Sequence, residues 1–191
     1  MGKRIGILGG TFDPPHIGHL IIADEILQAF RLEEVRFMPN HLPPHKKKDT
    51  DSTDADRLHM LRLATQDHPF FKIETIELER KGISYTYDTM RLLKAREPDA
   101  EFFFIIGADM AEYLPKWHKI DELVKLVQFI VVNRPGHRME TDYPVKKVNI
   151  PDISISSSVI RAKIEKGESV RYLLPRPVWE YIKEKGLYGS R

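Results

Sequence analysis

The sequence predicts an α/β domain built on a parallel β-sheet, and two observations support this fold class. Short apolar segments of strand length alternate along the chain with longer segments of helical periodicity, as in parallel sheets joined by right-handed crossovers. Residues 101–106 form a continuous apolar segment, which is typical of a central strand buried on both faces. The expected architecture is a Rossmann-like, doubly wound sheet of about five parallel strands with helices on both faces.

The expected elements alternate in this way along the whole chain. Strands are expected at residues 4–8, 35–39, 71–78, 101–106 and 129–133, with a further short strand at 147–150. Helices are expected at residues 18–30, 54–67, 86–96, 120–126, 156–166 and 177–185. Asp54 is expected to cap the second helix and Gly186 to end the last one. A long loop covers residues 40–53, and a loop of this length in a compact domain usually has a function.

Length and composition indicate one globular domain, residues 1–191, that is large enough to bury a stable core. The absence of cysteine excludes disulfides, thiolate metal sites and cysteine nucleophiles. The apolar segment that ends at Gly9 is too short for a signal peptide or a membrane span. A cytoplasmic protein without a membrane partner is therefore expected.

The charge pattern argues against a nucleic-acid partner. The net charge is +2, and the only dense basic run, Lys46–Lys48, is followed directly by acidic residues. A nucleic-acid-binding surface would need a longer basic stripe with interleaved aromatic residues. A local phosphate contact from this run remains open.

The segment after the first strand carries the clearest sign of a ligand site. Residues 9–19 read Gly-Gly-Thr-Phe-Asp-Pro-Pro-His-Ile-Gly-His and lead from a strand end into a helix start, where open parallel sheets bind ligands. Gly9 and Gly10 allow close approach of the backbone, and the helix start favours an anion such as phosphate. The spacing fits neither the dinucleotide fingerprint nor the Walker loop.

His16 and His19 are three residues apart at the start of this helix, so both rings can face one point, and Gly18 between them leaves room for a ligand. A protonated or hydrogen-bonding imidazole pair suits phosphate oxygens whose charge grows in a transition state. A helix-capping turn with two partly exposed histidines is the alternative. A zinc site is disfavoured because no third ligand is near in the sequence.

Residues 9–19 resemble the signature of the nucleotidyltransferase α/β-phosphodiesterase superfamily. Residues 155–161, Ile-Ser-Ser-Ser-Val-Ile-Arg, are similar to a second superfamily motif, with Ser158 where threonine is more common. The whole chain resembles one branch, the bacterial nicotinate-nucleotide adenylyltransferases. The segments specific to that branch are 38–40, 43–46, 84–89, 106–109 and 117–119.

The resemblance implies that ATP and nicotinate mononucleotide are the substrates, with nicotinate adenine dinucleotide and pyrophosphate as products. It implies His16 and His19 as catalytic residues, with His19 nearer the transferred group. The implied ATP-binding residues are Gly9, Gly10, Thr11, Phe12, His16, His19, Ile106, Gly107, Asp109, Ser157, Ser158 and Arg161. The implied nicotinate-nucleotide-binding residues are Thr11, Lys46, Tyr85, Thr86, Trp117 and His118.

Several of these residues also have plain structural explanations. Serines at a helix start normally cap free N–H groups, and Lys46 is equally consistent with a solvated surface lysine. Thr86 and Asp109 suit helix caps, and Trp117 suits a core position. Arg134 follows a strand but receives no role. Mg²⁺ is expected to be carried by the ATP phosphates, with no protein metal site.

Two other functions remain open. The first is an adenylyltransferase of the same fold that acts on nicotinamide mononucleotide, phosphopantetheine or FMN. The second is a nucleotide-binding regulator without turnover. The main hypothesis requires two helix starts, near His16 and near Ser156, to meet at one triphosphate site, with a C-terminal helical part (about residues 152–191) completing it. A homodimer is possible.

Overall fold

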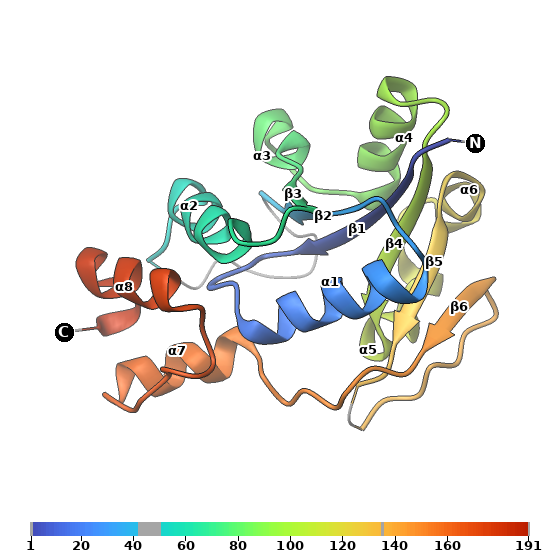
Figure 1. Cartoon of the computed structure of the whole chain (residues 1–191). Helices are drawn as coiled ribbons and strands as arrows, with labels where there is room; N and C mark the ends of the chain where they lie inside the picture. The colour runs from blue at the N-terminus through green and yellow to red at the C-terminus, as the bar shows by residue number, and fades with distance from the viewer. Residues whose placement is uncertain (1, 42–50, 135, 191) are drawn as a thin grey trace.

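The structure, a computed structural model, describes residues 2–41, 51–134 and 136–190. Its sheet has six parallel strands in the order β3-β2-β1-β4-β5-β6 (Figure 1). The strands are β1 Arg4–Gly10, β2 Glu34–Pro39, β3 Phe71–Ile73, β4 Glu101–Gly107, β5 Gln128–Val132 and β6 Val145–Val148. The α/β class with parallel strands is confirmed, and the short edge strand β6 brings the number to six.

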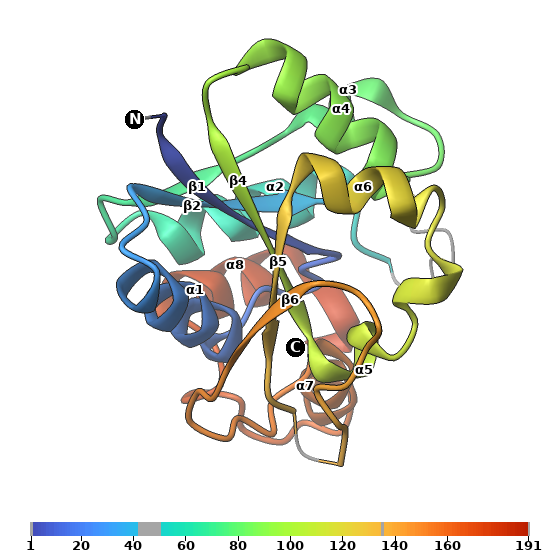
Figure 2. The same cartoon turned by 90° about the vertical axis from the view of Figure 1, so that its right-hand side faces the viewer.

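Helices cover both faces of the sheet (Figures 1 and 2). One face carries α1 Ile17–Ala29 and α2 Asp54–Thr65, and the other carries α3 Ile76–Arg80, α4 Thr86–Arg96, α5 Ala108–Ala111 and α6 Ile120–Leu126. Beyond the carboxyl ends of the strands lie α7 Ser157–Glu165 and α8 Arg176–Lys185. Two short 3₁₀ turns, η1 Leu114–Lys116 and η2 Leu187–Gly189, complete the described elements. None of the described helices is both long and apolar enough to cross a membrane.

The strand sequences explain why the sheet is buried on both sides. Along β4, Phe102 and Phe104 pack under α4 and α6, whereas Phe103 and Ile105 pack under α1. This alternation places side chains on opposite faces, as the pleat of a strand requires. A third apolar cluster joins α7, α8 and η2 to Met60 of α2, so the C-terminal residues form a small core against the end of the main one.

Three local predictions are corrected by the structure. The strand expected at residues 71–78 ends at Ile73, and the remaining residues enter α3, where Glu77 is buried against Thr89. The alternating apolar residues of this segment therefore continue from a short strand into a short helix with one buried face. The cap of α2 is Thr53, whose hydroxyl accepts from the backbone N–H of Asp56, so Asp54 is the first helical residue. The last expected strand is shifted to residues 145–148.

The end of the last helix agrees with the prediction. Gly186 follows α8 in the left-handed conformation, with φ of 64°. A residue with a Cβ atom is strained there, so the glycine suits the place where the chain turns into η2.

Candidate active site

The turn between β1 and α1, residues 11–16, lies at the carboxyl end of the sheet; we call it the β1–α1 turn. A Cβ atom on Gly10 would lie 3.0 Å from the ring of Phe12, so glycine lets this ring fold back over the strand end. A Cβ atom on Gly18 would lie 3.0 Å from the ring of His16. Gly18 therefore makes room for the imidazole, where the sequence suggested room for a ligand.

His16 and His19 form a close imidazole pair at the start of α1. Their rings stack with centroids 3.6 Å apart and an interplanar angle of 22°. The backbone N–H of His16 donates to Nδ1 of His19 at 3.1 Å, and the Phe12 and His19 rings form a T-shaped pair with centroids 4.9 Å apart. Nδ1 of His16 is buried without a hydrogen-bond partner. A buried nitrogen without a partner needs a physical explanation, and a ligand that pairs with it is one.

Both imidazoles are neutral at physiological pH. Burial, assisted by the charge of Arg134, lowers the pKa of His16 to about 4. Burial also lowers the pKa of His19 well below its usual value, with further contributions from His16 and Arg134. Because Nδ1 of His19 accepts a hydrogen bond, its neutral ring carries the proton on Nε2. His19 therefore offers an uncharged N–H donor.

Arg134, which received no role from the sequence, lies at the end of β5 near the imidazole pair. Its Nη1 pairs with Oδ2 of Asp109 at 2.8 Å, while Oδ1 of Asp109 is buried without a partner. A Cβ atom on Gly107 would lie 2.5 Å from that Oδ1. Gly107, not Asp109, is the N-cap of α5. The signal available in the sequence was a basic residue directly after a buried strand, at the sheet edge where ligands bind.

The start of α7 meets the β1–α1 turn directly. Ser156 caps α7 by accepting from the backbone N–H of Val159. Oγ of Ser157 donates to the carbonyl of Pro14 at 2.9 Å, and Nη1 of Arg161 donates to the carbonyl of Asp13 at 2.7 Å. The start of α7 and the turn that leads into α1 are therefore in contact, and a shared triphosphate site remains a prediction. Ser157 and Arg161 nevertheless use part of their hydrogen-bonding capacity to hold the turn.

Arg57 holds the other side of this turn, and sequence reasoning missed it. It is among the largest fully buried side chains, at 1% exposure. Its guanidinium donates to the carbonyl of Thr11 at 2.7 Å and to the carbonyl of Asn40 at 2.6 Å, and it pairs with Asp54 at 2.8 Å. It thus ties together the chain segments that leave β1 and β2. The sequence offers no signal for this, since an arginine on an amphipathic helix is normally exposed.

Four of the six residues predicted to bind the acceptor nucleotide lie near the start of α4, whereas Thr11 belongs to the β1–α1 turn and Lys46 lies outside the described residues. Tyr85 is the N-cap of α4, so Thr86 is the first helical residue rather than the cap. The rings of Tyr85 and His118 lie 4.6 Å apart. Trp117 is half-buried and packs edge-on against Phe104 of β4 with ring centroids 6.0 Å apart. Its core contact agrees with the structural explanation, and its partial exposure leaves ring surface for a ligand.

The remaining predicted residues are distributed as follows. Ile106 is buried at the carboxyl end of β4. Ser158 is exposed in the first turn of α7. Lys46 lies outside the described residues. Among residues 2–41, 51–134 and 136–190, no group of three or more histidine, aspartate or glutamate side chains gathers in a way that would hold a metal ion.

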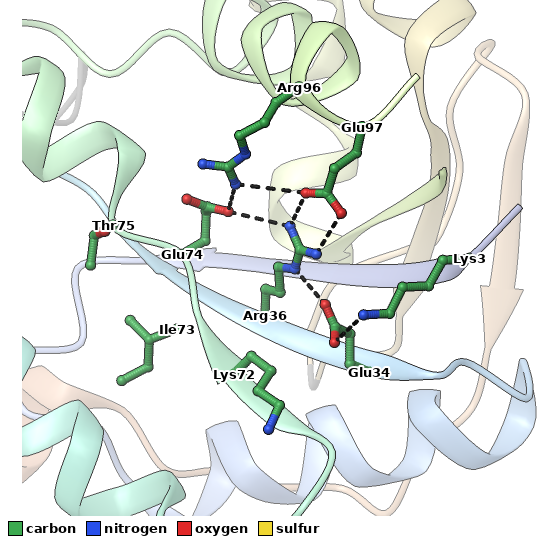
Figure 3. A pocket seen from close by; sticks show the side chains of 9 residues that line it. All are labelled: Lys3, Glu34, Arg36, Lys72, Ile73, Glu74, Thr75, Arg96 and Glu97. Atoms are coloured by element: carbon green, nitrogen blue, oxygen red, sulfur yellow. Dashed lines mark hydrogen bonds and ion pairs between the residues drawn. The ribbon is translucent and has the colours of Figure 1, made fainter. Parts of the chain in front are cut away.

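A second polar region lines a cavity of about 630 Å³ between β2, β3 and the C-terminal end of α4 (Figure 3). We call its paired side chains the charge cluster: Lys3, Glu34, Arg36, Glu74, Arg96 and Glu97. Arg36 donates to Glu34 at 2.6 Å and to both carboxylate oxygens of Glu97 at 2.6 and 2.8 Å. These opposite charges compensate one another within the protein.

Known proteins resemble this chain over nearly its whole length. Residues 7–163 match the Cytidylyltransferase-like family. The nicotinate-nucleotide adenylyltransferase of Bacillus subtilis is 52% identical over 188 residues, which cover 98% of this chain and 100% of that protein. A Geobacillus thermodenitrificans protein named "Probable nicotinate-nucleotide adenylyltransferase" is 60% identical over 191 residues, covering 100% of this chain and 88% of that protein.

The solved structures that resemble this chain agree in fold. The nicotinic acid mononucleotide adenylyltransferase of Plasmodium falciparum, complexed with NaAD, superposes with a TM-score of 0.83 at 23% identity. The match covers 99% of this chain and 98% of that one. The same enzyme complexed with APC gives a TM-score of 0.81.

Proposed function

This chain belongs to the nicotinate-nucleotide adenylyltransferase family, and we propose that its β1–α1 turn and the start of α7 together bind ATP for adenylyl transfer. The acceptor is nicotinate mononucleotide, and the products are nicotinate adenine dinucleotide and pyrophosphate, in NAD biosynthesis. The observation that carries the proposed site is the contact of the two helix starts through Ser157 and Arg161. Two helix starts directed at one place favour a multiply charged anion.

The reaction needs positioning and charge stabilisation more than proton transfer. A phosphate oxygen of the mononucleotide attacks the α-phosphorus of ATP, the bond to the bridging oxygen of the β-phosphate breaks, and pyrophosphate leaves with the electron pair. The attacking group is already an anion, so no general base is required. Catalysis then depends on holding both substrates in line and on stabilising the charge that develops on the α-phosphate.

We assign the imidazole pair to the ATP phosphates. The Nε2–H of His19 donates to the reacting phosphate, because its other ring nitrogen is already occupied by the backbone of His16. Neutral donors at this place stabilise developing charge without binding the ground-state anion as tightly as two cations would. The backbone at Gly9, Gly10, Thr11 and Phe12 and the Ser158 hydroxyl complete the proposed phosphate contacts.

Arg134 supplies the positive charge that the neutral histidines lack. Its guanidinium is half-exposed, interacts electrostatically with both imidazoles and is held by Asp109. An arginine can bind phosphate through two parallel N–H groups while it keeps a carboxylate partner on another edge. Arg161 adds a second guanidinium from α7. Ile106, Gly107 and Asp109 are proposed to contact the nucleoside part of ATP at the end of β4.

The acceptor is proposed to bind between the start of α4 and Trp117. The first turn of a helix has free backbone N–H groups, which suit the carboxylate of nicotinate better than the carboxamide of nicotinamide. Trp117 offers an aromatic surface for the pyridine ring, and Tyr85 and His118 border it. A contact of Lys46 with the nucleotide, a cytoplasmic location and a homodimer remain predictions from the sequence.

Mg²⁺ is proposed to enter as part of the substrate, bound to the ATP phosphates. The described carboxylates nearest the imidazole pair, those of Asp109 and Asp13, are held by Arg134 and by the hydroxyls of Ser52 and Tyr188. The other side chains there are imidazoles, hydroxyls and guanidinium groups, which suit phosphate oxygens rather than a hard cation. The protein then needs to recognise only the phosphates of the complex.

Steady-state kinetics with nicotinate mononucleotide and nicotinamide mononucleotide, measured by pyrophosphate release, tests this function. We expect a kcat/KM at least about tenfold higher for the acid, because the amide cannot use the helix N–H donors as well as a carboxylate does. Phosphopantetheine and FMN should give no turnover. Binding of ATP without pyrophosphate release for any acceptor would instead indicate a regulator.

A further inference from the structure

Tyr188, in the last turn η2, is a buried residue that the proposed reaction does not use. Its ring belongs to the C-terminal apolar cluster, and its hydroxyl donates at 2.5 Å to Oδ1 of Asp13, which lies outside that cluster. Its backbone is in the left-handed conformation, with φ of 57°, which a residue with a Cβ atom rarely adopts. A tyrosine held in this conformation with a buried hydrogen bond is positioned by its surroundings.

Asp13 lies at the centre of the β1–α1 turn. Its carboxylate is buried and also accepts from the hydroxyl of Ser52 at 2.5 Å. Its backbone carbonyl accepts from Arg161, and the next carbonyl, that of Pro14, accepts from Ser157. Tyr188, near the C-terminus, therefore holds this turn through the side chain of Asp13, and α7 holds it through two backbone carbonyls.

We propose that Tyr188 is a positioning residue for the ATP phosphates: by fixing the carboxylate of Asp13, it fixes the β1–α1 turn that presents His16 and His19. The inference rests on the proposed function, since it assigns a role toward a site that binds ATP. Only two residues separate Asp13 from His16, so a rotation of the Asp13 peptide moves the cap of α1 and the imidazole pair with it. Burial raises the pKa of Tyr188, which keeps its hydroxyl a donor throughout the working pH range.

Tyr181 provides a matched control. It lies on α8 in the same C-terminal unit, and its hydroxyl donates to Oδ1 of Asp56 on α2 at 2.7 Å. Both tyrosines thus make one hydrogen bond to an aspartate outside the C-terminal core. Only the bond of Tyr188 ends on the β1–α1 turn, because Asp56 belongs to the capping box of α2.

The test compares Tyr188→Phe with Tyr181→Phe in the full chain, by steady-state kinetics with each substrate varied in turn. We expect Tyr188→Phe to raise the KM for ATP about tenfold, the range for one hydrogen bond to a charged group, while the KM for nicotinate mononucleotide changes less than about twofold. Tyr181→Phe should leave both KM values within about twofold of wild type. Equal effects on both substrates, or equal effects of both variants, would show a structural role and overturn the inference.

Ser52→Ala keeps the inference testable if Tyr188→Phe does not fold. It removes the second hydroxyl donor to the same carboxylate, so the KM for ATP should rise in the same selective way. No selective rise in a folded Ser52→Ala variant would contradict a role for the Asp13 carboxylate. Wild-type protein that binds ATP but releases no pyrophosphate would refute the proposed function itself, whereas active wild type with an unchanged Tyr188→Phe variant would refute only this inference.

Discussion

The imidazole pair and the charge cluster are both partly buried polar regions of one sheet, but they satisfy their polar groups in opposite ways. In the charge cluster, Arg36 meets two carboxylates at 2.6 Å, and Lys3 neutralises one of them from its other side at 2.7 Å. In the imidazole pair, burial keeps both rings uncharged and leaves Nδ1 of His16 without a partner. The charges of the charge cluster are paired within the protein, whereas the imidazole pair has a buried nitrogen that is not paired.

This difference separates a structural site from a binding site better than the presence of a cavity does. The charge cluster borders a cavity of about 630 Å³, yet its charges compensate one another. The imidazole pair gains from an anion, because phosphate oxygens would accept from its free N–H groups and offset the charge of Arg134. Buried polar atoms without a partner also occur at Arg4, Asn40 and Arg57, so the free Nδ1 of His16 supports the proposed phosphate site only together with the contact of the two helix starts.

The largest expected effect is that of His19→Ala, which removes the proposed donor to the reacting phosphate. Turnover should fall by two to three orders of magnitude, roughly 3 to 4 kcal/mol of transition-state stabilisation. The free energy of unfolding should change far less than kcat. Pyrophosphate release under saturating substrates gives the measurement, and near-normal turnover would remove His19 from catalysis.

Arg36→Met should lower the free energy of unfolding and leave kcat nearly unchanged, the reverse of His19→Ala. It breaks a partly buried ion-pair network and leaves Glu34, Glu74 and Glu97 with less compensation, so the free energy of unfolding should fall by about 3 kcal/mol. Both KM values and kcat should stay within about twofold of wild type. Denaturant unfolding together with kinetics checks this, and a loss of activity in a stably folded variant would mean that the cluster contacts substrate.

The pH dependence of stability should separate the two regions into two windows. The pKa of His16 is about 6.5 in the unfolded chain and about 4 in the folded one, so only the unfolded state gains a proton as pH falls between these values. Stability is full above pH 6.5 and should be lost below it, by roughly 2.5 kcal/mol for His16 at pH 4.5.

The charge cluster should act at lower pH. Its ion pairs and hydrogen bonds lower the pKa values of Glu34 and Glu97 from 4.5, so their contribution is present above pH 4.5 and is lost as pH falls through the folded pKa values. Unfolding measured from pH 7 to pH 3 should show the upper window reduced by His16→Asn, with His19 accounting for the remainder, and the lower one reduced by Arg36→Met. If His16→Asn changed the lower window and Arg36→Met the upper one, the assignment of the two windows to these regions would be wrong.

Trp117→Ala has the smallest expected effect and sharpens the comparison within the active site. Loss of the aromatic surface should raise the KM for nicotinate mononucleotide about tenfold, roughly 1.4 kcal/mol, with little change in the KM for ATP. The same kinetics as above provide the measurement. An effect on ATP alone would place Trp117 in the nucleoside triphosphate pocket.

Much of the fold and part of the site were predictable because their signals are local. The alternation of apolar segments gave the parallel sheet, and the buried strand at residues 101–106 was identified from continuous hydrophobicity. The segment at residues 71–78 was misassigned because a one-sided short helix and a strand look alike over so few residues. The histidine spacing correctly placed two imidazoles side by side.

The sequence alone thus determined the order of the elements, the turn that bears the histidines and the family resemblance, since each depends on neighbouring residues. The tertiary structure decided that those histidines are neutral, that the charge of Arg134 acts on them, and that Arg57 and Tyr188 hydrogen-bond to the turn. Desolvation and hydrogen bonds arise only when distant segments meet, and Tyr188 and Asp13 are 175 positions apart.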